Sequence, residues 1–322
     1  MAAELSPEVV TFGEAMILFL AAGETPLAHA SQFDSFIAGT ESNLAIGLAR
    51  LGHRVGFFGR VGADVFGERI RRELRGEGVD VSALGTDAHR PTGLMVRDAV
   101  RAAPITVGYR RSGSAATALV TGDPPTSMIE QARVLHVTGI TAALSDTSYE
   151  ATLEAMRIAT RAGVRVSFDP NLRLRLAPVS RWQEIVDTLA RHCDIALTGA
   201  EEAEIFCPGV QPQTWFGERG ASIVVVKRGA LGASEYAFAA PAGQVTVHEP
   251  ARAVAMVDPV GAGDAFDAGW LSGWLRGLAP TERLREAAAV ASLVVATRGD
   301  ATGLPDVATR DRVLAEGQDV ER

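Results

Sequence analysis

A glycine-rich heptapeptide near the end of the chain carries the residues best placed for chemistry. It reads Asp258-Pro259-Val260-Gly261-Ala262-Gly263-Asp264 and precedes small and apolar residues spaced three and four positions apart, which predicts a helix. Uncovered N–H groups at a helix N-terminus form an anion site, and Asp264 could accept a proton beside a bound phosphate. The same residues also fit a plain glycine turn with an aspartate cap. The heptapeptide alone does not decide between the two interpretations.

The composition excludes several classes of protein. The chain has 322 residues, of which 47% are hydrophobic and 22% charged, as in ordinary globular proteins. Its net charge of −8 argues against a nucleic-acid-binding protein, which normally has a basic face. We find no signal peptide and no apolar stretch long enough to span a membrane, and Cys193 and Cys207 need no oxidising compartment. We therefore expect a cytoplasmic protein without nucleic-acid or membrane partners.

Short apolar strands alternate with helices through much of the chain. The expected strands include 134–137, 164–168, 195–197 and 222–226. A helix is expected at 180–192, beginning with the capping box Ser180-x-x-Gln183. This alternation predicts βαβ units and a mainly parallel sheet that is covered on both faces. No linker or repeat interrupts the pattern, so we expect a single domain over 1–322.

Polar residues follow these strands at the positions where each strand ends. Asp169 to Arg173 follow one strand, Thr198 to Glu201 the next, and Lys227 to Gly232 the third. In open α/β sheets, functional residues collect at this carboxyl edge. Lys227 is the only lysine of the chain, and it is either retained to contact phosphate or an ordinary surface residue.

Two further clusters have both a functional and a structural interpretation. Gly39 and Asn43 lie where a loop enters a helix, so Asn43 either faces a ligand or caps the helix. Tyr109 and Arg111 close a strand and are either solvated or hold an anionic ligand, for which arginine offers a fork of donors.

Together these residues resemble the ribokinase / phosphofructokinase-B family of carbohydrate kinases. Two signatures carry the resemblance, Gly39-x-x-x-Asn43-x-Ala45 and the heptapeptide ending at Asp264, and it extends over nearly the full length. Within the family the chain is most similar to 2-keto-3-deoxygluconate kinases. That similarity rests on the segments Tyr109-Arg110-Arg111-x-Gly113-Ser114-Ala115, His136-Val137-Thr138-Gly139-Ile140 and Asp169-x-Asn171-x-Arg173.

The resemblance implies a fold, a reaction and a set of site residues. The fold is a ribokinase-like, Rossmann-type three-layer α/β sandwich, with a small β lid formed by about 16–37 and 92–109. The reaction is phosphorylation of 2-keto-3-deoxygluconate to its 6-phosphate by ATP with Mg²⁺, Asp264 being the base and Gly261, Ala262 and Gly263 the anion hole. The implied sugar-binding residues are Gly39, Asn43, Tyr109, Arg111, Ile140, Arg173 and Asp264; the implied nucleotide-binding residues are Lys227, Gly229, Gly232, Gly261 and Gly263; the implied Mg²⁺ residue is Glu201.

The sequence departs from the family pattern at several positions, of which Pro259 in place of threonine is a minor one. Ala38 replaces the first glycine of a pair, and Thr198 replaces the asparagine of the usual Asn-x-x-Glu. Met95 stands where the subgroup often has tyrosine, which leaves the stereochemistry of the sugar open. Some relatives hold K⁺ near Asp258, and the sequence does not decide whether this chain does.

Other functions remain open. Fructokinase, ribokinase and 5-dehydro-2-deoxygluconokinase activities use the same fold, but Arg111 and Arg173 favour an acid over a neutral sugar. A non-catalytic sugar-acid sensor would not need Asp264 or Glu201. A nicotinamide oxidoreductase lacks its Gly-x-Gly-x-x-Gly, and a P-loop kinase lacks its Gly-Lys-Ser/Thr.

The lid also predicts an oligomeric state. The apolar runs 16–20, 94–96 and 105–107 belong to a small sheet, and a small sheet is marginal in water unless its apolar face is covered. We expect the sugar and the lid of a second subunit to cover it, in a homodimer or a higher homo-oligomer.

Overall fold

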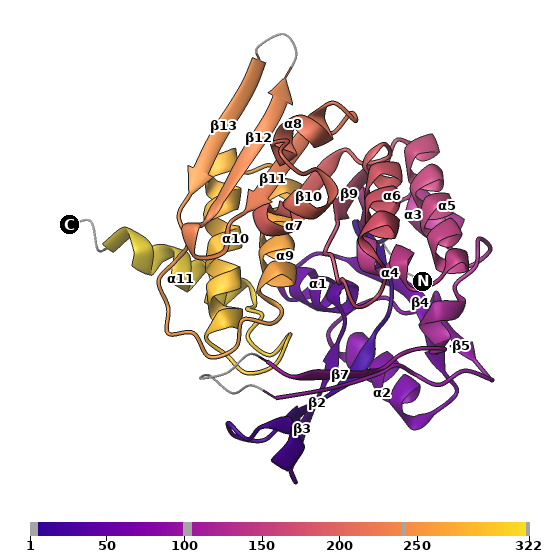
Figure 1. Ribbon diagram of the computed structural model, residues 1–322. Coiled ribbons are helices and arrows are strands. Elements are labelled where there is room, and N and C mark those ends of the chain that lie inside the picture. Colours follow the sequence, from indigo (N-terminus) through magenta and orange to yellow (C-terminus); the bar gives the residue numbers. More distant parts are fainter. Residues whose placement is uncertain (1–5, 99–104, 240–242, 320–322) are drawn as a thin grey trace, which may run out of the picture.

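A nine-stranded sheet forms the centre of the molecule (Figure 1). The structure is a computed structural model, and it describes residues 6–98, 105–239 and 243–319. The strand order is β13-β12-β11-β10-β9-β8-β1-β4-β5. In chain order these strands are β1 (Val9–Phe12), β4 (Val55–Gly62), β5 (Leu84–Asp87), β8 (Val134–Thr138), β9 (Arg165–Asp169), β10 (Ile195–Gly199), β11 (Ile223–Lys227), β12 (Ala233–Ala239) and β13 (Gly243–Glu249). All neighbours from β5 to β11 are parallel, and β12 and β13 are added antiparallel. The predicted α/β sandwich with a mainly parallel sheet is confirmed.

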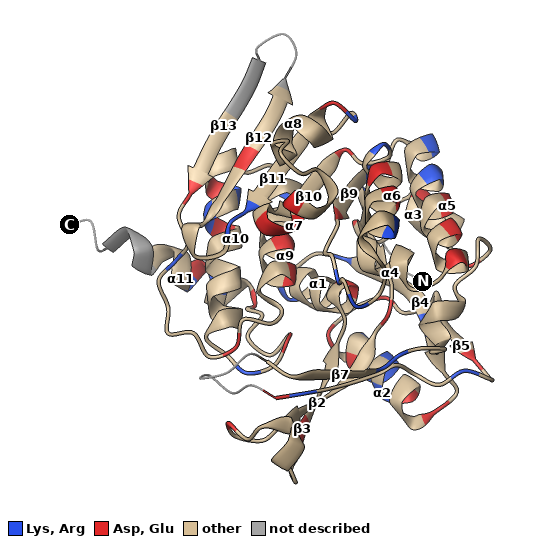
Figure 2. Ribbon diagram, viewed as in Figure 1, with Lys and Arg blue, Asp and Glu red and all other residues tan. Residues whose placement is uncertain are grey.

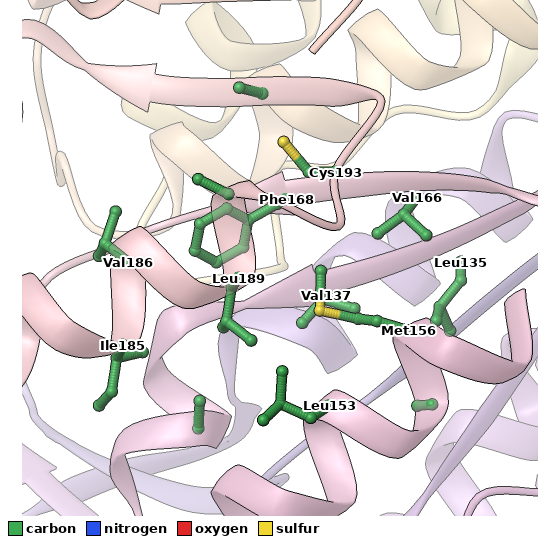
Figure 3. Packing of buried hydrophobic residues seen from close by; sticks show 14 of the residues in the cluster. Leu135, Val137, Leu153, Met156, Val166, Phe168, Ile185, Val186, Leu189 and Cys193 are labelled. Atoms are coloured by element: carbon green, nitrogen blue, oxygen red, sulfur yellow. The ribbon is translucent and has the colours of Figure 1, made fainter. Parts of the chain in front are cut away.

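Helices cover both faces of this sheet. One face packs against α5 (Asp146–Ala162), α6 (Val179–Ala190) and the shorter helices α3 (Thr126–Glu130), α4 (Gly139–Ala143), α7 (Ala200–Phe206) and α8 (Pro212–Gly217). The other face packs against α1 (Thr40–Arg50), α2 (Val65–Gly76), α9 (Ala262–Leu275) and α10 (Pro280–Val295). The last helix, α11 (Val307–Asp319), lies beside α10. Successive side chains of a strand point to opposite faces, so residues two positions apart enter the same core. In β9, for example, Val166 and Phe168 pack among Leu153, Ile185 and their neighbours (Figure 3).

A second, four-stranded sheet lies beside the main body, below it in Figure 1. Its order is β3-β2-β6-β7, with β2 (Met16–Ala21), β3 (Phe33–Ala38), β6 (Leu94–Arg97) and β7 (Val107–Arg110). These strands overlap the segments expected to form the lid, of which residues 99–104 lie outside the described residues. That the sheet acts as a lid, and that 1–322 is one domain, stay predictions.

The small sheet buries more of its apolar surface within one chain than the sequence suggested. Ile17, Leu18 and Leu20 are fully buried, and Met16 and Met95 are 5% exposed. Phe33 on the edge strand β3 stays 40% exposed. The apolar surface left for a partner is therefore smaller than expected and lies near the edge.

One local expectation is wrong. The helix expected from Ser180 begins at Val179, Pro178 takes the N-cap position, and no side chain caps it. Gln183 donates instead to the carbonyl oxygen of Ile205, 3.1 Å away, in a tertiary contact. Among the described helices none is long and apolar enough to cross a membrane.

Candidate active site

The carboxyl edge of the main sheet and the inner face of the small sheet enclose a cavity of about 640 Å³. Most of the predicted site residues line it: Gly39, Asn43, Tyr109, Arg111, Ile140, Arg173, Glu201, Lys227, Gly261, Gly263 and Asp264. Ala262 and the pair Gly229 and Gly232 are not among the lining residues. Both of these glycines lie in the turn after β11, which contains the 3₁₀ helix η3 (Gly229–Leu231). The strand ends thus bring together residues more than 200 positions apart in the chain.

The heptapeptide forms a tight turn into α9. Gly261 occupies the N-cap position with φ 85°, and a Cβ there would lie 2.3 Å from the carbonyl oxygen of Asp300, so the turn requires glycine. Gly263 differs, because a Cβ there would meet no protein atom within 4 Å and would point into open space beside the cavity. The N–H groups of Gly261 and Gly263 have no acceptor among the described residues. A bare helix N-terminus with free N–H groups facing a cavity is suited to an anion.

Asp264 does not cap its helix. It lies in the first turn of α9, 7% exposed, and accepts a hydrogen bond of 2.8 Å from the side-chain nitrogen of Asn43 on α1. This contact also removes the interpretation of Asn43 as a cap, since Gly39 holds the N-cap position of α1. Burial raises the pKa of Asp264 to about 7; Asp169 and Asp300 add to the rise, and Asn43 and Arg173 oppose it. A buried carboxylate with this pKa can take up a proton near neutral pH.

Gly39 places the first turn of α1 against the end of β1. It adopts φ 139°, and a Cβ would lie 2.3 Å from the carbonyl oxygen of Glu14. The close approach brings Asn43 to the cavity. The same close approach explains why position 39 is a glycine, even though Ala38 replaces the first glycine of the pair found in many family members.

The two arginines expected to face an acid differ in their partners. Arg111 forms an ion pair of 2.5 Å with Glu14 and is 10% exposed, so its charge is already compensated. It lies over the ring of Tyr109 at 5.4 Å from the centroid. Arg173 donates to the carbonyl oxygen of Leu172 at 2.9 Å, and no described carboxylate forms an ion pair with it. Arg173 is therefore the cation of the cavity with charge to offer a ligand.

Lys227 lies within a cluster of buried carboxylates. Its Nζ is 3.0 Å from Asp169 Oδ2 and from Asp267 Oδ1, and 3.1 Å from Asp267 Oδ2. Burial lowers the pKa of Lys227, but Asp169, Asp267 and Glu202 together outweigh it and raise the pKa above the usual lysine value. All three N–H donors face carboxylates, so contact with a phosphate would require one of these bonds to break.

Glu201 and its neighbour Glu202 have different environments. Glu202 accepts from the backbone N–H groups of Gly199 at 2.7 Å and Leu172 at 2.9 Å, and its side chain is thereby occupied. Glu201 is exposed, lines the cavity and has no hydrogen bond or ion pair with any described residue. Of this pair, only Glu201 is free to receive a ligand. Figure 2 shows such acidic residues on α7 and α9, two of the helices beside the cavity.

The site also contains acidic residues to which the sequence analysis assigned no specific role. Glu14 follows β1, Asp300 follows α10, and both line the cavity. Glu41 on α1 accepts 2.5 Å hydrogen bonds from Thr138 and Thr141 at Oε1, while Oε2 is buried without a partner. Burial raises the pKa of Glu41. Glu14 had a usable signal, since it follows a strand at the carboxyl edge, and Glu41 belongs to the polar cluster beside Asn43.

Residues able to hold Mg²⁺ fit a site that is shared with a ligand. No group of three or more His, Cys, Asp or Glu among the described residues could hold a metal alone. Mg²⁺ commonly keeps several waters and binds through one or two carboxylates plus substrate phosphates. The exposed carboxylate of Glu201 beside an open cavity matches that donor set.

Comparison with known proteins identifies the family. A model described as "pfkB family carbohydrate kinase" matches residues 6–307. The chain belongs to this family. A 2-dehydro-3-deoxygluconokinase of Bacillus subtilis (strain 168) is 37% identical, covering 96% of this chain and 94% of the relative; one of Thermoproteus tenax is 34% identical, covering 97% and 95%. The crystal structure of a PfkB protein from Polaromonas sp. JS666 superposes with a TM-score of 0.83 at 35% identity, covering 95% of this chain and 99% of that one. The chain is thus a carbohydrate kinase, as its two signatures indicated.

The hydrogen bond between Asn43 and Asp264 leads to a testable titration. Asn43→Ala removes a donor that stabilises the charged carboxylate, so the pKa of Asp264 should rise above about 7. Carboxyl ¹³C NMR of labelled aspartate measures this pKa directly. Ser42→Ala is the matched control, because Ser42 lies in the same turn and donates to Gly39, not to Asp264. An unchanged or lower pKa in Asn43→Ala would contradict the assignment.

Proposed function

We propose that this carbohydrate kinase phosphorylates 2-keto-3-deoxygluconate, also called 2-dehydro-3-deoxygluconate, at its 6-hydroxyl with ATP. The observation that carries the proposal is the pairing of one buried carboxylate, Asp264, with the free N–H groups of the glycine turn in a cavity that also holds Arg173. The first element can remove a proton, the second can hold an anion, and the third can bind an acid. The names of the relatives from Bacillus subtilis and Thermoproteus tenax support the same substrate.

The proposed reaction is a direct transfer. Asp264 takes the proton of the primary hydroxyl as its oxygen attacks the γ-phosphorus of ATP, and the bond to the β–γ bridging oxygen breaks to leave ADP. Developing negative charge on the transferred group lies against the N–H groups of Gly261 and Gly263. When bound, Mg²⁺ neutralises phosphate charge, and Glu201 is the residue that would hold its water ligands.

The nucleotide would lie beyond the glycine turn, toward β11 and η3. Gly229 and Gly232 lie in the turn after β11, where small residues permit close approach of a ligand to the backbone. We place Lys227 beneath this region as the counter-charge of Asp169 and Asp267, rather than at a phosphate, because its three donors are occupied.

The role of Asp264 is tested by replacing its carboxylate with an amide. Asp264→Asn should bind ATP and sugar while turnover falls about 10²–10⁴-fold, the usual loss for a positioned base. In the wild type, the base must be unprotonated, so kcat/KM should be lost as the pH falls through the pKa of about 7. A variant that keeps more than about a tenth of wild-type turnover would exclude Asp264 as the base.

The substrate class is tested by ADP release across a panel of 2-keto-3-deoxy acids and neutral hexoses. The keto acid should be preferred, and Arg173→Ala should weaken its binding by about 1.5–3 kcal/mol, the scale of a hydrogen bond to a charged group. These assays should be run about two pH units above the pKa of Asp264. Arg173 also lowers that pKa, and at such a pH Asp264 stays ionised with or without Arg173.

A matched control distinguishes recognition from general charge. Arg110 is exposed and lies outside the cavity lining, so Arg110→Ala should leave keto-acid binding unchanged. Equal losses for keto acids and neutral sugars in Arg173→Ala would show that Arg173 holds the fold or the nucleotide. A preference for neutral hexoses in the wild type would overturn the proposed substrate.

We further propose a homodimer joined at the lid edge, where Phe33 is 40% exposed on β3. An exposed edge strand offers unpaired backbone groups to a second chain. Light scattering at micromolar concentration should report at least two chains per particle, and Phe33→Asp should yield monomers. Val210 is equally exposed between α7 and α8, so Val210→Asp should leave the assembly intact. A monodisperse, active wild-type monomer would exclude the dimer.

A further inference from the structure

An arginine of the small sheet is buried between two carboxylates beside the glycine turn. Arg97 on β6 has a side chain that is 1% exposed. Its Nη2 lies 2.7 Å from Asp258 Oδ2 and 2.8 Å from Asp300 Oδ1, and its Nη1 lies 3.3 Å from Asp258 Oδ1. Asp258 is fully buried and Asp300 is 4% exposed. The guanidinium therefore bridges two segments of the main body from the lid.

The carboxylate of Asp258 has no remaining capacity for another ligand. Besides Arg97, Val260 N donates to Oδ1 and Gly299 N to Oδ2, each at 3.2 Å. An ionised carboxylate offers about four lone-pair positions, and four N–H groups now occupy them. A monovalent cation such as K⁺ needs lone pairs of the same atoms. The K⁺ site near Asp258 that some relatives have does not fit the residues present here.

Both partners of Arg97 fix the geometry of the glycine turn. Asp258 is its first residue, and the carbonyl oxygen of Asp300 lies so close behind Gly261 that a Cβ would come within 2.3 Å of it. Arg97 thus holds the start of the turn and the segment that supports its middle. Any change in the relative position of these segments would move the N–H groups of Gly261 and Gly263.

We propose that the Arg97 guanidinium takes the place of a monovalent cation at this turn, as a positioning residue that makes the enzyme independent of K⁺. The inference rests on the proposed role of the turn as the anion hole. Without a cation, Asp258 and Asp300 would repel each other and would also repel the anionic group in transfer. A tethered guanidinium supplies this charge permanently, because arginine stays protonated at any working pH.

The first test compares monovalent cations. Turnover and the melting temperature of the wild type should be unchanged when K⁺ is replaced by Na⁺ or tetramethylammonium at constant ionic strength. Arg97→Ala should lose about 10²–10³-fold in kcat, the scale of disturbing an oxyanion hole. Millimolar guanidinium or K⁺ should restore part of this loss and raise the melting temperature of the variant but not that of the wild type.

Two further variants separate positioning from folding. Arg283 is another buried arginine, paired with Glu235 on β12 away from the cavity, so Arg283→Ala should be destabilised without cation-dependent recovery of turnover. Arg97→Lys keeps the charge but not the fork. It should fold, retain intermediate activity and remain independent of K⁺, which keeps the test decisive if Arg97→Ala does not fold.

The outcomes are distinguishable from failure of the proposed function. A wild type that requires K⁺ for turnover, or is stabilised by K⁺ but not by tetramethylammonium, would overturn the inference. So would an Arg97→Ala enzyme with full, cation-independent activity. If no sugar is phosphorylated at all, the proposed function fails, and the melting temperatures still decide whether Arg97 occupies the place of a cation.

Discussion

The structure depends on how buried carboxylates are compensated at one edge of the main sheet. Parallel strands deliver their carboxyl ends to the same place, so acidic residues from distant segments meet there. Their charges are compensated by ion pairs with different cations. Asp258 and Asp300 both pair with Arg97, Asp169 and Asp267 both pair with Lys227, and Glu14 pairs with Arg111. Removing one partner from such a buried pair leaves an uncompensated charge, which costs about 3–5 kcal/mol. The site and the fold are therefore held by the same interactions.

Asp264 differs from these ion-paired carboxylates, and the difference is useful. Its direct partner is a neutral amide, Asn43, so burial is only partly compensated and the pKa rises to about 7. Had Arg97 or Lys227 faced Asp264, the carboxylate would remain ionised and would be a poorer proton acceptor near neutral pH. Arg97, Arg111 and Lys227 are instead committed to other carboxylates. Their placement leaves Asp264 with a proton affinity suited to the reaction.

An acidic chain can accept an anionic ligand because compensation is local. The net charge of −8 describes the whole surface, whereas the cavity presents Arg173 and the N–H groups of the glycine turn. Both kinds of positive group line the same cavity, so the local charge that a ligand meets there differs from the charge of the whole chain.

The sequence allowed the fold and the location of the site to be predicted, because both follow from local patterns. Apolar strands alternating with helices specify the parallel sheet, and the glycine turn before α9 marks the edge at which the cavity lies. The antiparallel hairpin β12–β13 was not predicted, although the residues from Gln244 to His248 alternate in polarity. Ion pairs were not predictable either, since Arg97 and Asp258 are 161 positions apart and only the fold brings them together. The failed capping box at Ser180 has a similar cause, because Gln183 is used by a tertiary contact.

The single lysine of the chain shows that residue type alone does not define a role. The sequence left contact with phosphate and an ordinary surface position open for Lys227, and the structure gives a physical reason for an ammonium group. Nζ must donate to Asp169 on β9 and Asp267 on α9 from the end of β11, in the narrow space between sheet and helix. A compact ammonium carries three donors that radiate from one atom, whereas the planar guanidinium of arginine directs its donors along fixed lines. The opposite geometry applies to Arg97, whose fork spans Asp258 and reaches Asp300. The choice between lysine and arginine at this edge follows from the arrangement of the carboxylates, and the two cations are not interchangeable.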